Sequence, residues 1–288
     1  MKRAKSIFLW CGELVEQWRG WLPYWGFCSK KVRTSIKKHR HLGKCKFEEI
    51  IYLAVILYGG RNLALSVFNC MRLKQLTQKE YSSHIENKTL RLAFIGMSNA
   101  GKSYRAKVLR DECEFMWYHV DGEIQKTLGF KTMEEISEWL GYPTSSTYLE
   151  RERKYLDAED KYTMINTLDT GGKNLVSDTT GSVIYLKADT HNWLEENCLM
   201  VNIQVDEKTI SELIKNFFEK PKPVIWQGFF NQKENESERE ALERCYPKLL
   251  SYRLEKYRTM AHVNIPAEKL YNTSGQETLD VIKPYLEK

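Results

Sequence analysis

Apolar and polar positions follow a regular alternation after residue 90. Short apolar runs, which are typical of buried strands, cover residues 92–95, 115–120, 175–176, 199–207 and 262–265. Amphipathic or helix-favouring segments lie between and after them and predict helices over residues 104–110, 132–143, 144–168, 209–220, 241–260 and 275–288. Strands that alternate with helices indicate an open α/β sheet, and such sheets bind ligands beyond the carboxyl ends of their strands.

Charge divides the chain into two parts. Residues 1–88 carry 17 Lys and Arg against 6 Asp and Glu, whereas residues 89–288 carry 27 against 32. The contrast predicts a basic, aromatic and largely helical N-terminal extension (1–88) and a separate domain (89–288). The seven cysteines are widely spread and form no C-x-x-C pair, which indicates reduced thiols in an intracellular protein, either cytoplasmic or organellar.

The N-terminal extension has features of a targeting or membrane-associated region. Its most apolar stretch, residues 50–68, contains Gly59, Gly60 and Arg61 near its centre, and a central arginine is costly in a bilayer. Two short buried or membrane-surface helices therefore fit better than a spanning helix, although contact with a membrane stays open. The basic run 30–46 suits anionic lipid, nucleic acid or plain solvation, and we expect no specific nucleic-acid partner.

The strongest chemical signal is G-x-x-x-x-G-K-S, which runs from Gly96 to Ser103. It follows the apolar run 92–95 and precedes helix-forming residues, so strand, loop and helix come in the order of a phosphate-binding loop. Glycines let the backbone curl so that its N–H groups face phosphate oxygens, and the helix adds the positive end of its dipole. The pattern predicts a nucleotide site.

The positions of this loop have distinct expected roles. Lys102 should reach the β- and γ-phosphates of ATP, and Ser103 should bind Mg²⁺. Asp178 follows the strand at 175–176, so we expect it beside Ser103, where a carboxylate can hold Mg²⁺ directly or through water. The other expected nucleotide-binding residues are Gly96, Ser98, Asn99, Ala100, Gly101 and Tyr104.

Residues 90–288 resemble the shikimate kinases, small P-loop kinases, in the segments FIGMSNAGKS, VDGEIQKTLG and YRLEKY. The resemblance implies a three-layer α/β/α sandwich with a mainly parallel sheet and a lid. It also implies that Asp121 binds the acceptor hydroxyls and that Arg253 holds a substrate carboxylate. Thr180 and Gly181 would then line the acceptor pocket, and Lys222 would be a lid cation.

Several positions depart from the pattern of that family. His119 stands where a second acid is usual, and Leu149 where an arginine is usual. Three glycines are replaced by 179–181, Thr-Thr-Gly, whose side chains would narrow or re-line the pocket. Lys220 or Lys222 replaces the lid arginine and can neutralise a phosphate only as a point charge. The resemblance therefore supports ATP handling better than it supports shikimate as the substrate.

These observations predict an ATP-dependent small-molecule kinase that acts as a monomer. The γ-phosphoryl would pass to an acceptor hydroxyl that Asp121 orients, while Lys102 and Lys222 offset its charge. One alternative is a nucleotide-binding regulator without transfer activity, which His119 and Leu149 favour. Another is a membrane-tethered scaffold whose important part is the N-terminal extension. The acceptor itself cannot be read from the sequence.

Overall fold

The computed structural model describes residues 76–219 and 224–288. The chain divides into two units, Met1–Phe68 and Asn69–Lys288, and every described residue belongs to the second unit. The expectations for the basic run 30–46, the apolar stretch 50–68, Lys220 and Lys222 concern positions outside the described residues. Within the described ranges, no helix combines the length and the apolar character needed to cross a membrane.

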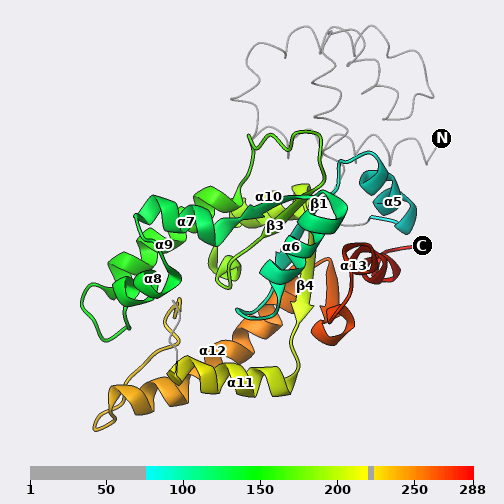
Figure 1. Ribbon diagram of the computed structural model, residues 1–288. Coiled ribbons are helices and arrows are strands. Elements are labelled where there is room, and N and C mark those ends of the chain that lie inside the picture. The colour runs from blue at the N-terminus through cyan, green and yellow to red at the C-terminus, as the bar shows by residue number, and fades with distance from the viewer. Residues whose placement is uncertain (1–75, 220–223) are drawn as a thin grey trace, which may run out of the picture. The chain divides into compact units, whose positions relative to one another are not determined.

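A five-stranded, fully parallel sheet with the order β2-β3-β1-β4-β5 forms the centre of the second unit (Figure 1). Its strands are β1 (Arg91–Ile95), β2 (Met116–His119), β3 (Leu175–Asp178), β4 (Leu199–Gln204) and β5 (Val263–Pro266). Strand β1 is central, and its last four residues are all buried, as expected for an apolar run covered on both faces. The predicted α/β class with a parallel sheet is confirmed.

Helices flank the sheet (Figure 1). They are α5 (Gln78–Glu86), α6 (Lys102–Cys113), α7 (Val120–Leu128), α8 (Met133–Leu140), α9 (Tyr148–Thr163), α10 (Ala188–Asn197), α11 (Glu207–Glu219), α12 (Glu238–Met260) and α13 (Gly275–Ile282), with short 3₁₀ turns η3 (Val183–Tyr185), η4 (Ala267–Leu270) and η5 (Lys283–Tyr285). Helix α6 contacts β1, β2 and β3, whereas α10 and α12 contact β4.

Two local features place side chains at the site, and the first of them differs from the sequence expectation. The second strand stops at His119, and Val120 already begins helix α7, so Asp121 lies in the first turn of a helix rather than at a strand end. Helix α12 runs through Pro247, and a capping box of Ser237 and Glu240 fixes its start. Both features bring side chains of helices to the carboxyl edge of the sheet.

Helix α5 packs against the C-terminal segment of the chain. The Tyr81 hydroxyl donates to the Leu279 carbonyl at 3.2 Å, and Tyr81 is buried. The Gln78 N–H donates to the Glu287 carbonyl at 2.7 Å. Helix α5 therefore belongs to the same unit as the sheet, although it lies before the boundary predicted at residue 88.

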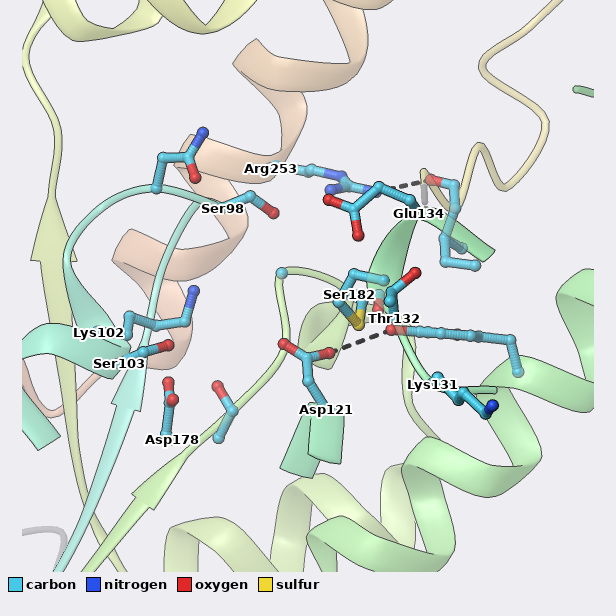
Figure 2. Close-up of a pocket in the computed structure, with 16 residues that line it drawn as sticks. Ser98, Lys102, Ser103, Asp121, Lys131, Thr132, Glu134, Asp178, Ser182 and Arg253 are labelled. Atoms are coloured by element: carbon cyan, nitrogen blue, oxygen red, sulfur yellow. Dashed lines mark hydrogen bonds between the residues drawn. The ribbon is translucent and has the colours of Figure 1, made fainter. Parts of the chain in front are cut away.

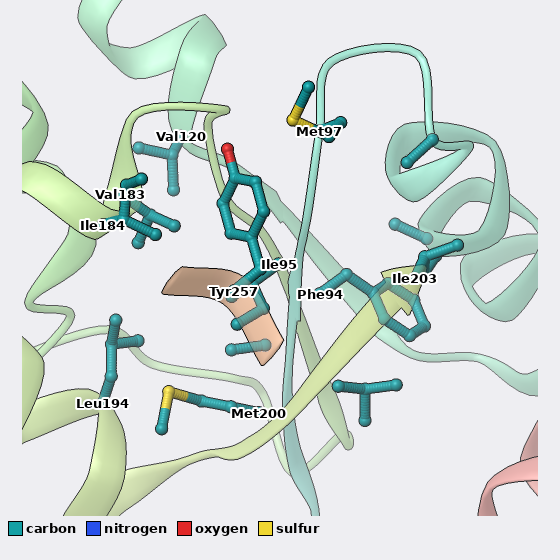
Figure 3. Close-up of a cluster of buried hydrophobic side chains, with 14 of the residues drawn as sticks. Phe94, Ile95, Met97, Val120, Val183, Ile184, Leu194, Met200, Ile203 and Tyr257 are labelled. Carbon is teal, nitrogen blue, oxygen red and sulfur yellow. The ribbon is translucent and has the colours of Figure 1, made fainter. Parts of the chain in front are cut away.

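The apolar core reaches the phosphate loop. Phe94 and Ile95 from β1 pack in one buried cluster with Met200 from β4 and Tyr257 from α12 (Figure 3). The hydroxyl of Tyr257 donates to the carbonyl of Gly181, in the segment that follows β3. A rigid core thus supports both the loop after β1 and the segment after β3.

Candidate functional site

A pocket of about 450 Å³ opens at the carboxyl ends of β1, β2 and β3 (Figure 2). Loops, helix starts and the segment after β3 contribute the residues that line it, namely Ser98, Asn99, Lys102, Ser103, Asp121, Lys131, Thr132, Met133, Glu134, Tyr155, Asp178, Thr179, Gly181, Ser182, Ile225 and Arg253. This is the edge at which open α/β sheets bind ligands.

Two glycines of the loop from Gly96 to Gly101 have positive φ angles, which other residues rarely adopt. Gly96 has a φ of 134°, and a Cβ placed there would lie 2.9 Å from the Ile203 carbonyl oxygen. Gly101 has a φ of 94° and no side chain to cap helix α6, so the first N–H groups of that helix have no side-chain cap. Such a helix start is suited to an anion.

Lys102 is only 7% exposed and bends back over the loop. Its ammonium donates to the carbonyls of Gly96 at 2.9 Å and Met97 at 3.0 Å. These contacts hold a positive charge at the centre of the loop. Phosphate oxygens are stronger partners for an ammonium than neutral carbonyls, so the side chain is placed to exchange one set of partners for the other.

Asp178 ends β3 and is 2% exposed. Its Oδ2 atom is buried and has no hydrogen-bond partner among the described residues, and His119 Nε2 lies 3.7 Å from it. The sheet register sets His119 directly beside Asp178. A buried carboxylate oxygen without a donor is costly unless it gains a partner, and a metal ion or its water is a suitable one.

Asp121 faces the middle of the pocket, where the Tyr155 hydroxyl donates to its Oδ1 at 3.3 Å (Figure 2). Burial raises the pKa of Asp121 above its ordinary value, and the negative charge of Asp178 acts in the same direction. Lys102 and His119 oppose this rise in the pKa without cancelling it. A carboxylate with a raised pKa is a better proton acceptor than an ordinary aspartate.

The segment after β3 is held by hydrogen bonds to a buried acid whose role was not predicted from the sequence. Glu159 of α9 is fully buried and accepts hydrogen bonds from the hydroxyls of Ser182, at 2.5 Å, and Thr180. Burial raises the pKa of Glu159 to about 8. Glu159 lies one helical turn after Tyr155, so one face of α9 supports the pocket. Only this i, i+4 spacing could have indicated its role, because α9 is rich in charge throughout.

Arg253 is the one arginine among the described residues that line the pocket. Its Nη2 donates to the Ile225 carbonyl at 2.7 Å, and its Nε donates to the Tyr185 hydroxyl at 3.3 Å. Arg151, two residues after Leu149 on α9, donates to the Trp139 carbonyl at 2.5 Å and does not line the pocket. Leu149 is 72% exposed and does not line it either.

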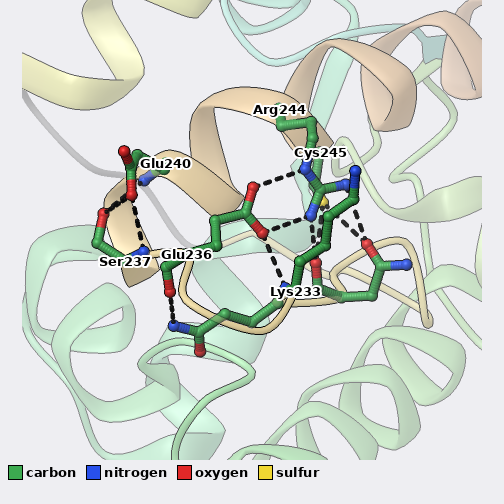
Figure 4. Close-up of polar contacts among 8 residues, drawn as sticks. Lys233, Glu236, Ser237, Glu240, Arg244 and Cys245 are labelled. Carbon is green, nitrogen blue, oxygen red and sulfur yellow. Dashed lines mark hydrogen bonds and ion pairs between the residues drawn. The ribbon is translucent and has the colours of Figure 1, made fainter.

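The chain that follows the predicted lid lysines is anchored to helices α9 and α12. Glu152 accepts from the N–H groups of Trp226 at 2.9 Å and Gln227 at 3.1 Å. Further on, Arg244 donates to Glu236 at 2.7 Å and to the Asn231 carbonyl at 2.6 Å (Figure 4). These hydrogen bonds therefore hold the described part of the predicted lid region against helices α9 and α12.

Most of the residues singled out in the sequence meet in this pocket. Those that line it are Ser98, Asn99, Lys102, Ser103, Asp121, Asp178, Gly181 and Arg253. Gly96, Ala100 and Gly101 shape the loop, and Thr180 is buried beside the pocket with its hydroxyl on Glu159. Tyr104 is 62% exposed, lies outside the lining and contacts the guanidinium of Arg105 at 4.5 Å. Lys222 lies outside the described residues.

The resemblance noted in the motifs agrees with the fold, a parallel sheet with a phosphate loop after its central strand. No protein-family model matches the chain, and no curated protein matches it by sequence. Among solved structures, it is similar to shikimate kinase from Acinetobacter baumannii in complex with shikimate, with 22% identity over 70% of this chain and 96% of that chain and a TM-score of 0.48.

Two further shikimate kinases are similar to the chain. The enzyme from Bacteroides thetaiotaomicron has 16% identity over 68% of this chain and 97% of that chain, with a TM-score of 0.45. The enzyme from Aquifex aeolicus has 17% identity over 66% and 92%, with a TM-score of 0.40.

Proposed function

We propose that the protein is an ATP-dependent phosphotransferase that moves the γ-phosphoryl group of ATP to a hydroxyl of a small molecule. One observation carries the proposal: the loop lysine Lys102, the hydroxyl of Ser103 and the carboxylates of Asp121 and Asp178 line a single pocket. Phosphoryl transfer needs a phosphate cradle, a metal position and a group that orients the nucleophile. Lys102 would serve the first, Ser103 and Asp178 the second, and Asp121 the third.

The residues present fit a Mg²⁺-bound nucleotide. Ser103 and Asp178 would hold the ion, and Figure 2 shows both on the same side of the cavity as Lys102. When bound, Mg²⁺ would neutralise charge on the phosphates. In the described ranges no three His, Cys, Asp or Glu side chains gather as a metal cage, in keeping with an ion that takes few protein ligands beside phosphate and water.

Each side chain of the pocket would have a separate role in the transfer. Lys102 would leave the carbonyls of Gly96 and Met97 to stabilise negative charge on the phosphates. Asp121 would orient the acceptor hydroxyl and take its proton, which the raised pKa of this carboxyl favours. Tyr155 would keep the Asp121 carboxylate in place through its hydrogen bond. Most of the catalysis would come from positioning and from fixed charges.

The test of this role is Asp121→Asn in the full chain. The variant should bind MgATP as the wild type does but should lose acceptor-dependent ADP formation by about 10²-fold or more. A coupled ADP assay with a panel of sugars, polyols and hydroxy acids measures turnover, and calorimetry measures nucleotide binding. A variant that keeps full turnover with an acceptor used by the wild type would contradict the role given to Asp121.

A second candidate is a nucleotide-binding protein without transfer activity. The observation that favours it is His119 beside Asp178, because the imidazole lies 3.7 Å from the carboxylate oxygen that a metal ion would use, and imidazole nitrogen is a poorer partner for Mg²⁺ than oxygen. The panel above separates the two candidates. MgATP binding without ADP formation for any acceptor would favour the regulator.

A further inference from the structure

We propose that Arg253 is a further catalytic residue, whose guanidinium nitrogen Nη1 contacts the γ-phosphoryl group of ATP from a different side of the pocket than Lys102. The inference rests on the proposed function and adds a second cation for the group that is transferred. It differs from the role that the resemblance implies for Arg253, which is to hold a carboxylate of the substrate.

Arg253 of α12 is a buried cation without an ion pair. It is 6% exposed, and among the described residues no Asp or Glu forms an ion pair with it. Burial raises the pKa of Glu159 to about 8 in spite of the charge of Arg253, so this buried acid is mostly neutral at pH 7. A buried cation without a counter-ion is costly, and its position in the pocket lining therefore indicates an anionic ligand.

The side chain of Arg253 is held in place, with one nitrogen left for a ligand. Nη2 donates to the Ile225 carbonyl at 2.7 Å, and Nε donates to the Tyr185 hydroxyl at 3.3 Å. The guanidinium carbon also lies 5.3 Å from the centre of the Tyr185 ring. Within the described ranges, Nη1 has no hydrogen-bond partner. A donor that is fixed in this way needs little reorganisation when an anion arrives.

This remaining nitrogen lies beside the phosphate loop. A Cβ placed on Gly181 would be 2.8 Å from the Ser98 hydroxyl oxygen and 3.8 Å from Arg253 Nη1. Both atoms are therefore within 4 Å of one point, and all three residues line the pocket. Ser98 is the third residue of the loop that begins at Gly96, so Arg253 approaches the edge of the phosphate cradle.

The γ-phosphoryl group would lie between this loop and Asp121, because the acceptor hydroxyl that Asp121 orients must attack in line. Figure 2 shows Lys102, Asp121 and Arg253 on three sides of the cavity. In the transfer, the acceptor oxygen bonds to the γ-phosphorus and its proton passes to Asp121. The bond from the γ-phosphorus to the bridging oxygen breaks, and its electron pair stays on ADP. A fixed guanidinium would stabilise the charge on the transferred group.

The experiment compares two nucleotides on the full chain without an acceptor. Calorimetry measures the affinity for MgADP and for the magnesium complex of AMP-PNP, an ATP analogue with nitrogen at the bridge between the β- and γ-phosphates. Arg253→Gln should weaken AMP-PNP binding by about tenfold or more and ADP binding by about twofold at most. Arg258→Gln, an exposed arginine of the same helix outside the lining, should change neither affinity.

A second variant leaves Arg253 intact. Gly181→Ala adds a methyl group at the point between Ser98 and Nη1, and it should weaken AMP-PNP binding more than ADP binding. This variant carries the test if Arg253→Gln does not fold by circular dichroism. Equal changes for the two nucleotides, or no change, would overturn the inference and would agree with a role in acceptor binding alone. A wild type that binds neither nucleotide would overturn the proposed function as well.

Discussion

At the scale of single residues, the surroundings of Asp178 indicate a ligand most clearly. Its Oδ2 atom is buried with no hydrogen-bond partner in the described part of the chain, and it lies 3.7 Å from His119 Nε2. If this oxygen holds the metal or its water, Asp178→Asn should raise the Mg²⁺ concentration for half-maximal activity far more than His119→Asn does. Titration of Mg²⁺ at fixed ATP measures the effect. Equal requirements in the wild type and Asp178→Asn would leave Asp178 as a strand-end residue only.

Glu159 makes a pH prediction at the same scale. Its pKa rises from 4.5 to about 8 on burial, so the folded state binds this proton more tightly than the unfolded state does. The contribution to stability is therefore complete below about pH 4.5 and is lost as the pH rises toward 8. Glu159→Gln, which still bonds Thr180 and Ser182, should remove this part of the pH dependence.

Denaturant unfolding of the wild type and Glu159→Gln at several values between pH 5 and pH 8 checks the prediction. The difference in the free energy of unfolding between the two proteins should shift in favour of the variant as the pH rises. A difference that stays constant over this range would show that Glu159 is not protonated in the folded protein at the lower pH.

The residues of the site were predictable from sequence in unequal measure. Lys102 and Ser103 belong to a motif whose spacing sets the position of each residue around a phosphate, so their positions in the pocket could be predicted directly. Glu159 could not be found, because a carboxylate in a charged helix is ordinarily solvated and its burial arises from the packing of α9 against the segment after β3.

At the scale of elements, strands were easier to predict than their ends. The apolar run before the loop is β1, as predicted. The next strand ends one residue earlier than predicted, because Val120 begins helix α7, and Asp121 therefore lies in a helical turn. Helix α10 and helix α7 went unpredicted, whereas α5 falls within the extension that we expected to be largely helical. Both unpredicted helices are short and take their stability from tertiary contacts, which local sequence does not show.

Helix α5 gives a prediction about the domain boundary. A fragment of residues 89–288 loses the buried Tyr81 and the contacts of Gln78, whereas a fragment of residues 69–288 keeps them. Burial of one large side chain contributes about 1.5–3 kcal/mol. We expect the longer fragment to unfold cooperatively at a higher temperature than the shorter one. Equal melting temperatures by circular dichroism would show that α5 adds no stability to the domain.

At the scale of the whole molecule, one chain joins a basic N-terminal part to a unit built on a parallel α/β sheet with a G-x-x-x-x-G-K-S loop after its central strand. The alternation of apolar runs and helical segments was enough to predict the parallel sheet, because the pattern repeats over the whole unit.

The central claim is that the loop from Gly96 to Ser103 binds MgATP through Lys102. Calorimetric titration of the full chain with MgATP tests it most directly, with Lys102→Ala compared with Lys107→Ala, an exposed lysine of the same helix outside the pocket. We predict measurable binding to the wild type and to Lys107→Ala, and a loss of about tenfold or more in affinity for Lys102→Ala. No binding to the wild type, or equal affinity in all three proteins, would contradict the claim.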